Sequence, residues 1–181
     1  SIGEVILPRM TNVYYNSESG EDKAKALINT TMKIAMLLAL PLCFGMIGVA
    51  SYLIPWYAAS APELAPLIML GCPIIIFISM SNVTGIQYLV PTGNYSVYSR
   101  SVVIGACINA CVNAALIGKF GAYGAIIGSI IAEFMVTLVQ YLSVRKSVKI
   151  NFLDASYFKY LMASVLMCFG VLMIGRFMGA S

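Results

Sequence analysis

The sequence predicts an all-α, polytopic transmembrane helix bundle with five full spans and the end of one further helix. Of its 181 residues, 60% are hydrophobic and only 10% are charged, and its mean hydropathy is +0.89. A soluble domain carries about 25% charged residues, so this chain has too few charges to cover a soluble surface. Several of its runs also reach the ~20 apolar residues that one crossing of the bilayer requires.

The elements follow from the order of apolar and polar runs. An amphipathic pattern in residues 1–10 predicts the end of a transmembrane helix, and the polar segment 11–32 predicts a loop. Residues 33–144 are predicted to form a bundle of four spans, at 33–55, 66–90, 97–118 and 122–144. The pattern opens partway through a helix, from which we expect a fragment of a longer protein; the resemblance described below implies that an N-terminal lobe precedes it.

A fifth span follows the bundle. Residues 145–156 are basic and then mixed in character, which predicts a loop, and residues 157–181 hold an additional span at 157–178. The tripeptide Pro91-Thr92-Gly93 is a turn signal between the second and third spans. Every connection is too short to hold a folded soluble domain.

The basic residues orient this bundle. Because successive helices alternate in direction, one set of loops and span ends holds nine of the 11 basic residues, and the other set holds Lys119 and Arg176. Lysine and arginine gather on the cytoplasmic side of a membrane. We therefore expect a multi-pass protein of a bacterial or archaeal plasma membrane, with residues 11–30, 91–96 and 145–156 in the cytoplasm. The scattered positive charge predicts no nucleic-acid partner.

Prolines and glycines mark special positions inside the spans. Pro41 and Pro73 each remove a backbone hydrogen bond and predict kinks, which suit either a transporter that rocks between two states or a static, better-packed bundle. Gly124 and Gly128 form a GxxxG face on the fourth span, which lets another helix approach closely.

Six polar side chains inside the spans are candidates for lining a substrate cavity, because polar groups in hydrocarbon face a bundle interior or a cavity. They are Asn82, Gln87, Asn109, Asn113, Glu133 and Thr137. Asn109 and Asn113 share one helix face, and they either bond to another helix or form a cavity wall. Arg100, at the expected cytoplasmic mouth of the third span, is either a topology anchor or a phosphate-binding group.

Glu133 lies about halfway along the fourth span, where a carboxylate is unfavourable unless it is paired, hydrated or protonated. The other spans place no lysine or arginine at a matching depth. Glu133 is therefore either a cavity residue, which lines a substrate path or couples protons, or a protonated packing residue.

The chain shows no set of residues for catalysis, metal binding or cofactor binding. It has no histidine and five cysteines, all within apolar runs, which we interpret as packing residues. A glycine-rich phosphate loop would follow a strand, whereas the glycines at 118–128 lie between membrane-length apolar runs. The sequence thus predicts a non-enzymatic protein with no metal and no cofactor.

Three stretches resemble the C-terminal half of the polysaccharide repeat-unit flippases, a branch of the MATE-like (MOP) transporter superfamily. They are GEVILPR at 3–9, GIQYLVPTG at 85–93 and NAALIGKFGAYGAIIGSIIAE at 113–133. The resemblance extends to about Lys146, and Gly118 stands where the family usually has proline. It implies a MATE-like C-terminal lobe that flips undecaprenyl-pyrophosphate-linked oligosaccharides to the outer leaflet by alternating access, for surface polysaccharide biosynthesis.

The resemblance also implies partners, and several other functions remain as alternatives. The expected partners are the lipid-linked glycan, the lipid bilayer, and a polysaccharide polymerase and glycosyltransferases. Family members hold the pyrophosphate with cationic residues, and here only Lys33 and Arg100 lie near a cavity mouth. The alternatives are a lipid II flippase or a multidrug/cation antiporter of the same superfamily, and, from other classes, a membrane enzyme or a non-catalytic structural subunit.

Overall fold

A computed structural model of the chain describes residues 2–16, 20–145, 147–148 and 155–178, and within these ranges it contains helices and turns but no strand. The helices are α1 (Ile2–Asn16), α2 (Gly20–Tyr57), α3 (Leu64–Gly71), α4 (Pro73–Ser81), the π-helix η1 (Asn82–Leu89), α5 (Tyr95–Phe120), α6 (Ala122–Val144) and α7 (Ala155–Met178). Five of the described stretches are long and apolar enough to cross a membrane. The predicted all-α polytopic bundle is therefore confirmed.

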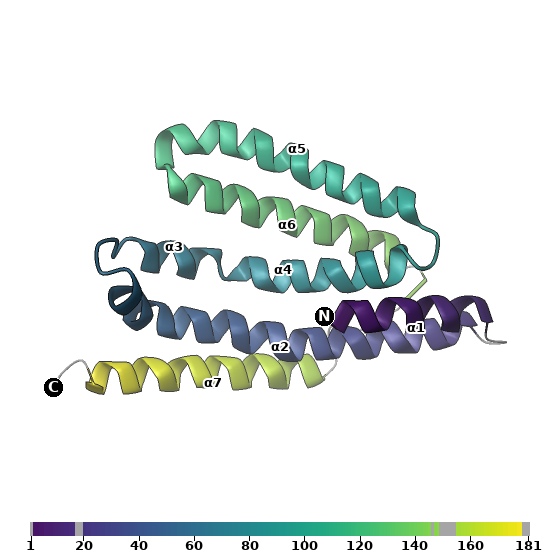
Figure 1. The fold of residues 1–181 in the computed structure, drawn as a ribbon, viewed down its shortest axis with the longest axis horizontal. Helices are drawn as coiled ribbons and strands as arrows, with labels where there is room; N and C mark the ends of the chain where they lie inside the picture. The colour runs from purple at the N-terminus through teal and green to yellow at the C-terminus, as the bar shows by residue number, and fades with distance from the viewer. Residues whose placement is uncertain (1, 17–19, 146, 149–154, 179–181) are drawn as a thin grey trace.

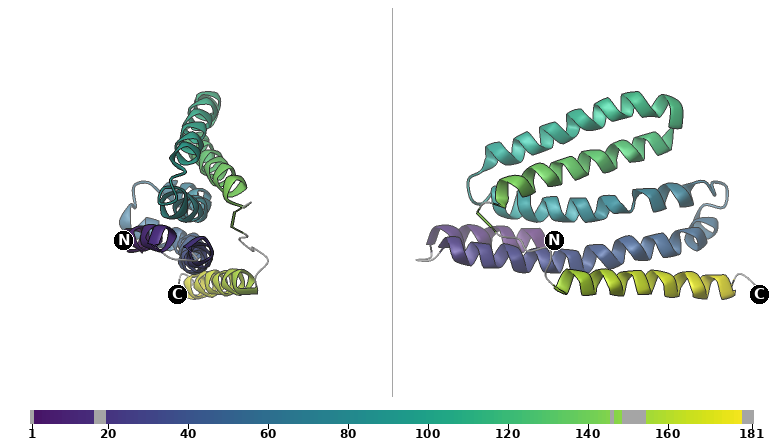
Figure 2. Two further views of the ribbon diagram at one scale, coloured as in Figure 1. Left: turned by 90° about the vertical axis from the view of Figure 1, so that its right-hand side faces the viewer. Right: turned by 180° about the vertical axis from the view of Figure 1, so that it is seen from behind.

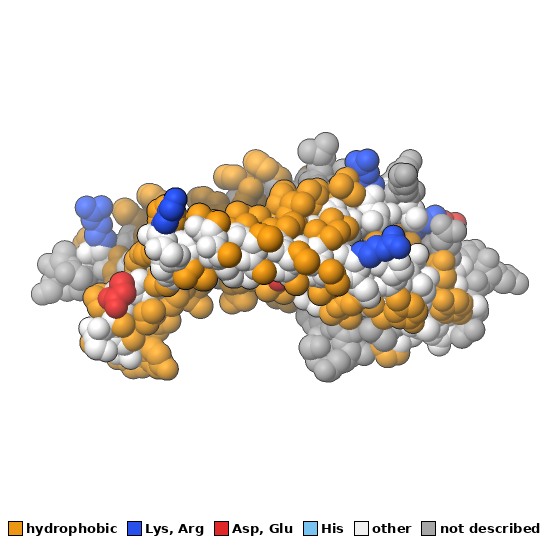
Figure 3. All heavy atoms as spheres, turned by 90° about the horizontal axis from the view of Figure 1, so that it is seen from above, with side chains coloured by type: hydrophobic (Ala, Val, Ile, Leu, Met, Phe, Trp, Pro, Cys, Tyr) orange, Lys and Arg blue, Asp and Glu red, His pale blue; other side chains and the backbone are white. Residues whose placement is uncertain are grey.

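The spans lie side by side in one row, in the order α5, α6, α3–α4, α2 and α7 (Figure 1). Helix α1 packs against α2 and η1, at the end of the second span that precedes the turn at 91–94 (Figure 2). Because the row is open on both faces, many large apolar side chains remain exposed. Figure 3 shows the edge of the row at α5, where hydrophobic side chains predominate between charged ends. Such a surface suits contact with lipid.

The buried core lies at one end of the helices, near the turn at 91–94. Met10, Ile28 and Met32 are fully buried there, together with Val83 of η1 and Val148 beyond α6. Residues from α1, α2, η1 and the end of α6 thus meet in one apolar cluster. This cluster fixes the ends of these helices next to the turn at 91–94.

The segment predicted as a loop at 11–32 is instead largely helical. Helix α1 continues to Asn16 and α2 begins at Gly20, whereas residues 17–19 lie outside the described ranges. The reason is an amphipathic pattern in which Ala24 and Ile28 are fully buried one helical turn apart. The polar residues on the opposite face of this helix are the reason that a loop was predicted.

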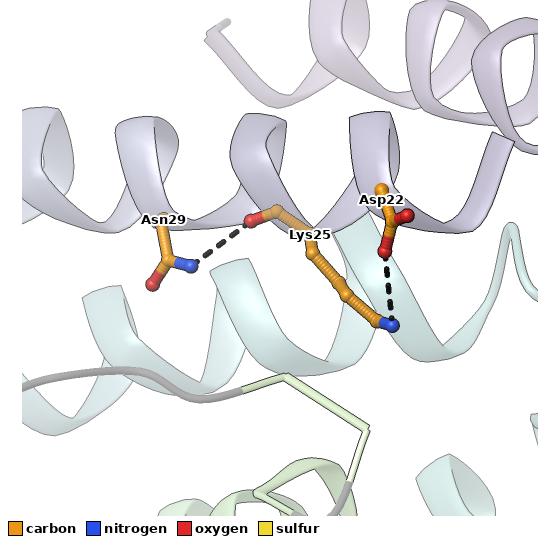
Figure 4. Close-up of polar contacts among 3 residues, drawn as sticks. All are labelled: Asp22, Lys25 and Asn29. Atoms are coloured by element: carbon orange, nitrogen blue, oxygen red, sulfur yellow. Dashed lines mark hydrogen bonds and ion pairs between the residues drawn. The ribbon is translucent and has the colours of Figure 1, made fainter. Parts of the chain in front are cut away.

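That outer face of α2 shows ordinary surface interactions (Figure 4). The Lys25 ammonium lies 3.4 Å from the Asp22 carboxylate, and the Asn29 amide donates to the Lys25 carbonyl oxygen at 3.0 Å. An exposed ion pair of this kind contributes only ~0–1 kcal/mol. Burial of the apolar face, rather than these contacts, therefore holds this part of α2 in place.

The second span is built from three helical segments. Helix α3 ends at Gly71 and α4 begins at Pro73, which occupies the first turn of α4, where the missing N–H is tolerated. The π-helix η1 then runs from Asn82 to Leu89. Helix α2, in contrast, continues through Pro41 as a single helix. The backbone of the second span therefore changes geometry twice.

Two short turns complete the bundle. Gly93 has φ of 78° in the turn before α5, and Gly121 has φ of 54° between α5 and α6. This backbone region favours glycine because it lacks a Cβ. The connection between the predicted spans 97–118 and 122–144 is shorter than expected, because α5 continues to Phe120. Of the predicted loop at 145–156, residues 146 and 149–154 lie outside the described ranges, and α7 begins at Ala155.

Candidate functional site: a polar cavity among three spans

A cavity of about 580 Å³ lies between the second span, α5 and α6, and we call it the polar cavity. Its volume falls within the range of roughly 300–1,000 Å³ that ligand pockets have. Its apolar lining includes Ile78, Ile86, Val102 and Val136. The polar side chains that line it are Ser81, Asn82, Tyr98, Asn109, Glu133 and Gln140.

Glu133 is the one acidic or basic residue that lines the polar cavity within the described part of the chain. It comes from the middle of α6 and is half-buried. No hydrogen bond or ion pair joins it to another described residue. Since a carboxylate in a membrane span needs water or a ligand when it has no protein partner, its position on the cavity wall is consistent with either.

Asn109 lines the cavity on α5, and Asn113 supports it from the next turn. The Asn113 Nδ2 donates to the Asn109 Oδ1 at 2.7 Å, and the Asn109 Nδ2 lies 3.4 Å from the Ser129 Oγ of α6. The Asn113 Oδ1 is buried without a hydrogen-bond partner and lies where a Cβ at Gly128 would be. Asn113 therefore positions Asn109 and packs into the notch that Gly128 leaves.

Gln140 joins three elements at the end of the cavity nearest the turn at 91–94. Its Nε2 donates to the Ser101 Oγ of α5, and its Oε1 accepts from the Thr84 Oγ1 of η1, each at 2.9 Å. Gln140, Ser101 and Thr84 are all buried. A Cβ at Gly85 would lie 2.8 Å from the Gln140 Nε2, so only a glycine leaves room for this arrangement without a shift.

The structure brings Asn82, Asn109 and Glu133 together in the polar cavity and places the other candidates elsewhere. The Thr137 hydroxyl donates to the Phe77 carbonyl oxygen at 2.9 Å and so ties α6 to α4. Gln87 is buried and lines a second hollow, beside α2. The side chain of Arg100 is exposed and does not line the polar cavity.

The predicted cavity residues did not include Gln140, Tyr98 and Ser81. Gln140 follows Glu133 by seven residues, and this spacing already placed both polar residues on one face of the fourth span, although Gln140 was not among the candidates. Tyr98 and Ser81 lie at the ends of apolar runs, where polar residues are common. Their role depends on how the second span, α5 and α6 pack together, which their own positions in the sequence do not show.

Gly124 and Gly128 lie where α6 meets α5. A Cβ at Gly124 would lie 2.7 Å from the Leu116 carbonyl group, and a Cβ at Gly128 would meet the Asn113 side chain. The helix that approaches this GxxxG face is therefore α5, the neighbour in the same hairpin. Close packing there brings Asn109 and Ser129 within reach of each other.

No group of three or more histidine, cysteine, aspartate or glutamate side chains that could hold a metal ion occurs among the described residues. Comparison with protein-family models, with curated proteins and with solved structures finds no match for this chain. The polar cavity is therefore interpreted from its own geometry and chemistry.

Proposed function

We propose that this chain is part of a non-enzymatic transporter that moves a polar group across the bilayer through the polar cavity. The observation that carries the proposal is the gathering of Asn82, Asn109, Glu133 and Gln140 around one cavity between membrane-spanning helices. Polar side chains within a span are unfavourable unless they pair or line a hydrated path. Here they line a cavity large enough to hold a ligand.

The substrate class that we propose is a lipid-linked oligosaccharide, in line with the resemblance to the polysaccharide repeat-unit flippases. Amides and hydroxyls both donate and accept hydrogen bonds, as a sugar requires, and Ile78, Ile86 and Val102 provide apolar contacts beside them. No described lysine or arginine lines the cavity, so an anionic pyrophosphate would be bound outside it. Polymerase and glycosyltransferase partners remain part of this proposal.

Alternating access would use two irregular points in the helix of the second span. Its helix lacks one backbone N–H at Pro73, and from Asn82 it continues as a π-helix, a form that often occurs at functional sites. The buried cluster holds one end of this span, whereas the α5–α6 hairpin has little buried surface at its far end. We propose that the spans move about this packed end.

A second candidate is a multidrug/cation antiporter, which the position of Glu133 favours. When ionised, a carboxylate on the wall of a cavity that no described lysine or arginine lines attracts cations and repels anions. A flippase would use the same cavity for neutral sugars. The two candidates therefore differ in the charge of the group that enters.

Deletion of the full-length gene tests the proposal and separates the two candidates. The flippase predicts loss of the surface polysaccharide and accumulation of its lipid-linked intermediate on the cytoplasmic side. Unchanged polysaccharide with hypersensitivity to cationic drugs would instead support the antiporter. If neither phenotype appears, the chain belongs to a structural subunit and the transport proposal fails.

The substitution Glu133→Gln then tests the carboxylate in the restored gene. Glutamine keeps the size and removes the charge, so we expect normal protein levels with transport reduced roughly tenfold or more, the effect of losing ~1.4 kcal/mol of a specific interaction. Quantifying the restored polysaccharide gives the result. Full activity of this variant would remove Glu133 from any essential ionic role.

A further inference from the structure

A second hollow lies on the other side of the second span, between α2 and the α4–η1 segment, and we call it the α2 groove. Its volume is about 230 Å³, and Thr31, Leu38, Leu42, Ser79 and Gln87 are among its lining residues. Asn82 lines both this groove and the polar cavity. The other residues that line the groove differ from those that line the polar cavity.

Thr31, Asn82 and Gln87 provide polar atoms toward one end of the α2 groove, and Ser79 lies farther along, about two helical turns from Gln87. The Thr31 hydroxyl donates to the Leu27 carbonyl, the Ser79 hydroxyl donates to the Ile75 carbonyl, and the Asn82 Nδ2 donates to the Ile78 carbonyl. The two hydroxyls thus use their only donor within their own helices, and Asn82 uses one of its two N–H groups in this way. The oxygen lone pairs that remain can accept from a ligand.

Gln87 lacks a hydrogen-bond partner among the described residues. Its side chain is only 6% exposed, and its Oε1 is buried without a partner. An unpaired amide in an apolar surrounding is unfavourable, and a rotation of the terminal amide exchanges its oxygen and nitrogen. A group that both donates and accepts would therefore satisfy Gln87 in either orientation.

The other end of the α2 groove is apolar and open. Ile34, Leu38 and Leu42 follow one another at single-turn intervals on α2 and are 42%, 54% and 57% exposed. From Thr31 to Leu42 the helix rises ~16 Å, about half of the ~30 Å hydrocarbon layer. Gln87 lies at the opposite, polar end, close in sequence to the turn at 91–94.

We propose that the α2 groove binds one lipid of the adjoining leaflet whose headgroup is an uncharged hydroxyl. The hydroxyl lies beside Gln87 and Asn82 near the membrane surface, and one acyl chain runs along Ile34, Leu38 and Leu42. The order of polar and apolar residues along the groove matches the order within such a lipid. No charged side chain among the described residues lines the groove, so a headgroup phosphate would have no oppositely charged partner from them there.

Photo-crosslinking of the full-length protein in phosphatidylcholine vesicles tests this inference. The probes are diacylglycerol with a diazirine in one acyl chain, and phosphatidic acid with the same chain and a phosphate on the same hydroxyl. We expect diacylglycerol to label the segment from Ile34 to Leu42 roughly fivefold more than phosphatidic acid does, as one net hydrogen bond would produce. Equal labelling by the two probes would overturn the proposal.

A matched region and two variants complete the experiment. The apolar hollow lined by Leu67 and Ile68 has no comparable polar end, so both probes should label it equally. Gln87→Met and Gln87→Leu remove the amide, and we expect either variant to lower diacylglycerol labelling of the groove to the phosphatidic acid level. Unchanged labelling in a folded variant, or hydroxyl-radical footprinting that finds water in an unlabelled groove, would contradict the lipid assignment.

Discussion

Gln140 connects α6 to both α5 and η1 through two buried hydrogen bonds. The Ser101 hydroxyl accepts from Gln140 and donates its own proton to the Tyr98 carbonyl. The single proton of the Thr84 hydroxyl is shared between the Gln140 Oε1 and the Met80 carbonyl, each at 2.9 Å. Loss of Gln140 would therefore leave each hydroxyl with an acceptor in its own helix. The interaction fixes geometry more than it adds stability.

We expect Gln140→Leu to lower the free energy of unfolding in detergent by ~0.6–1.7 kcal/mol, the range measured for hydrogen bonds between membrane helices. Leucine keeps most of the volume but cannot bond to Ser101 or Thr84. The matched control is Ser143→Ala, because the Ser143 hydroxyl bonds only to the Val139 carbonyl of its own helix. A larger effect in the control than at Gln140 would contradict this account.

Candidate cavity residues could be predicted from the sequence only in part. An ionisable or amide group in the middle of an apolar run is conspicuous, and this signal found Asn82, Asn109 and Glu133, which share the polar cavity. The same signal could not separate them from Thr137 or Gln87, which have the same composition around them. Only helix packing decides which face of each span meets the cavity.

At the scale of elements, the α5–α6 hairpin depends on contact between backbones. Gly124 allows α6 to lie directly against the Leu116 carbonyl of α5. Near the turn, in contrast, Gly118 has open space around the position of a Cβ. The two glycines therefore have different roles within one hairpin.

Gly124→Ala should lower stability by about 1–3 kcal/mol, because the added methyl group meets a rigid backbone and the helices must separate. Gly118→Ala should be neutral or stabilising by up to ~1 kcal/mol, since alanine is the better helix former and nothing obstructs it. Thermal unfolding of the two purified variants measures the difference. Equal destabilisation by both changes would show that the contact at Gly124 is unimportant.

A comparison of predicted and observed helix bounds shows where a sequence pattern is sufficient to predict an element. Span 122–144 was predicted with the bounds that α6 has, because Gly121 and Arg145 flank a continuous apolar run. The helical part of 11–32 was missed, because an amphipathic helix that extends beyond the apolar region has the composition of a loop. The π-helix at η1 was also not predicted, and its residues Thr84 and Gly85 pack against Gln140, a contact far away in the sequence.

At the scale of the whole molecule, the turns alternate between the two ends of the spans (Figure 1). The turn at 91–94 and the end of α6 lie at one end, and residues 58–63 and Gly121 lie at the other. This alternation is what five spans in one row require. The asymmetric charge then predicts which end faces the cytoplasm.

We predict that the turn at 91–94 is cytoplasmic and that Lys119 is external. Single cysteines at Asn94 and Lys119, with the native cysteines replaced, test this with a membrane-impermeant thiol reagent on intact cells. Lys119→Cys should react at once, whereas Asn94→Cys should react only after permeabilisation. The reverse pattern would invert the topology and place the basic ends outside.

The central claim is that the polar cavity is the transport path, and a single cysteine at Ala110 tests it most directly. Ala110 lines the cavity, whereas its neighbour Cys111 is exposed elsewhere on α5. In full-length protein without other cysteines, a water-soluble methanethiosulfonate should modify Ala110→Cys and block transport of the lipid-linked oligosaccharide, and protein with only Cys111 should keep its transport. If Ala110→Cys does not react, or transports normally once modified, the polar cavity is not the path.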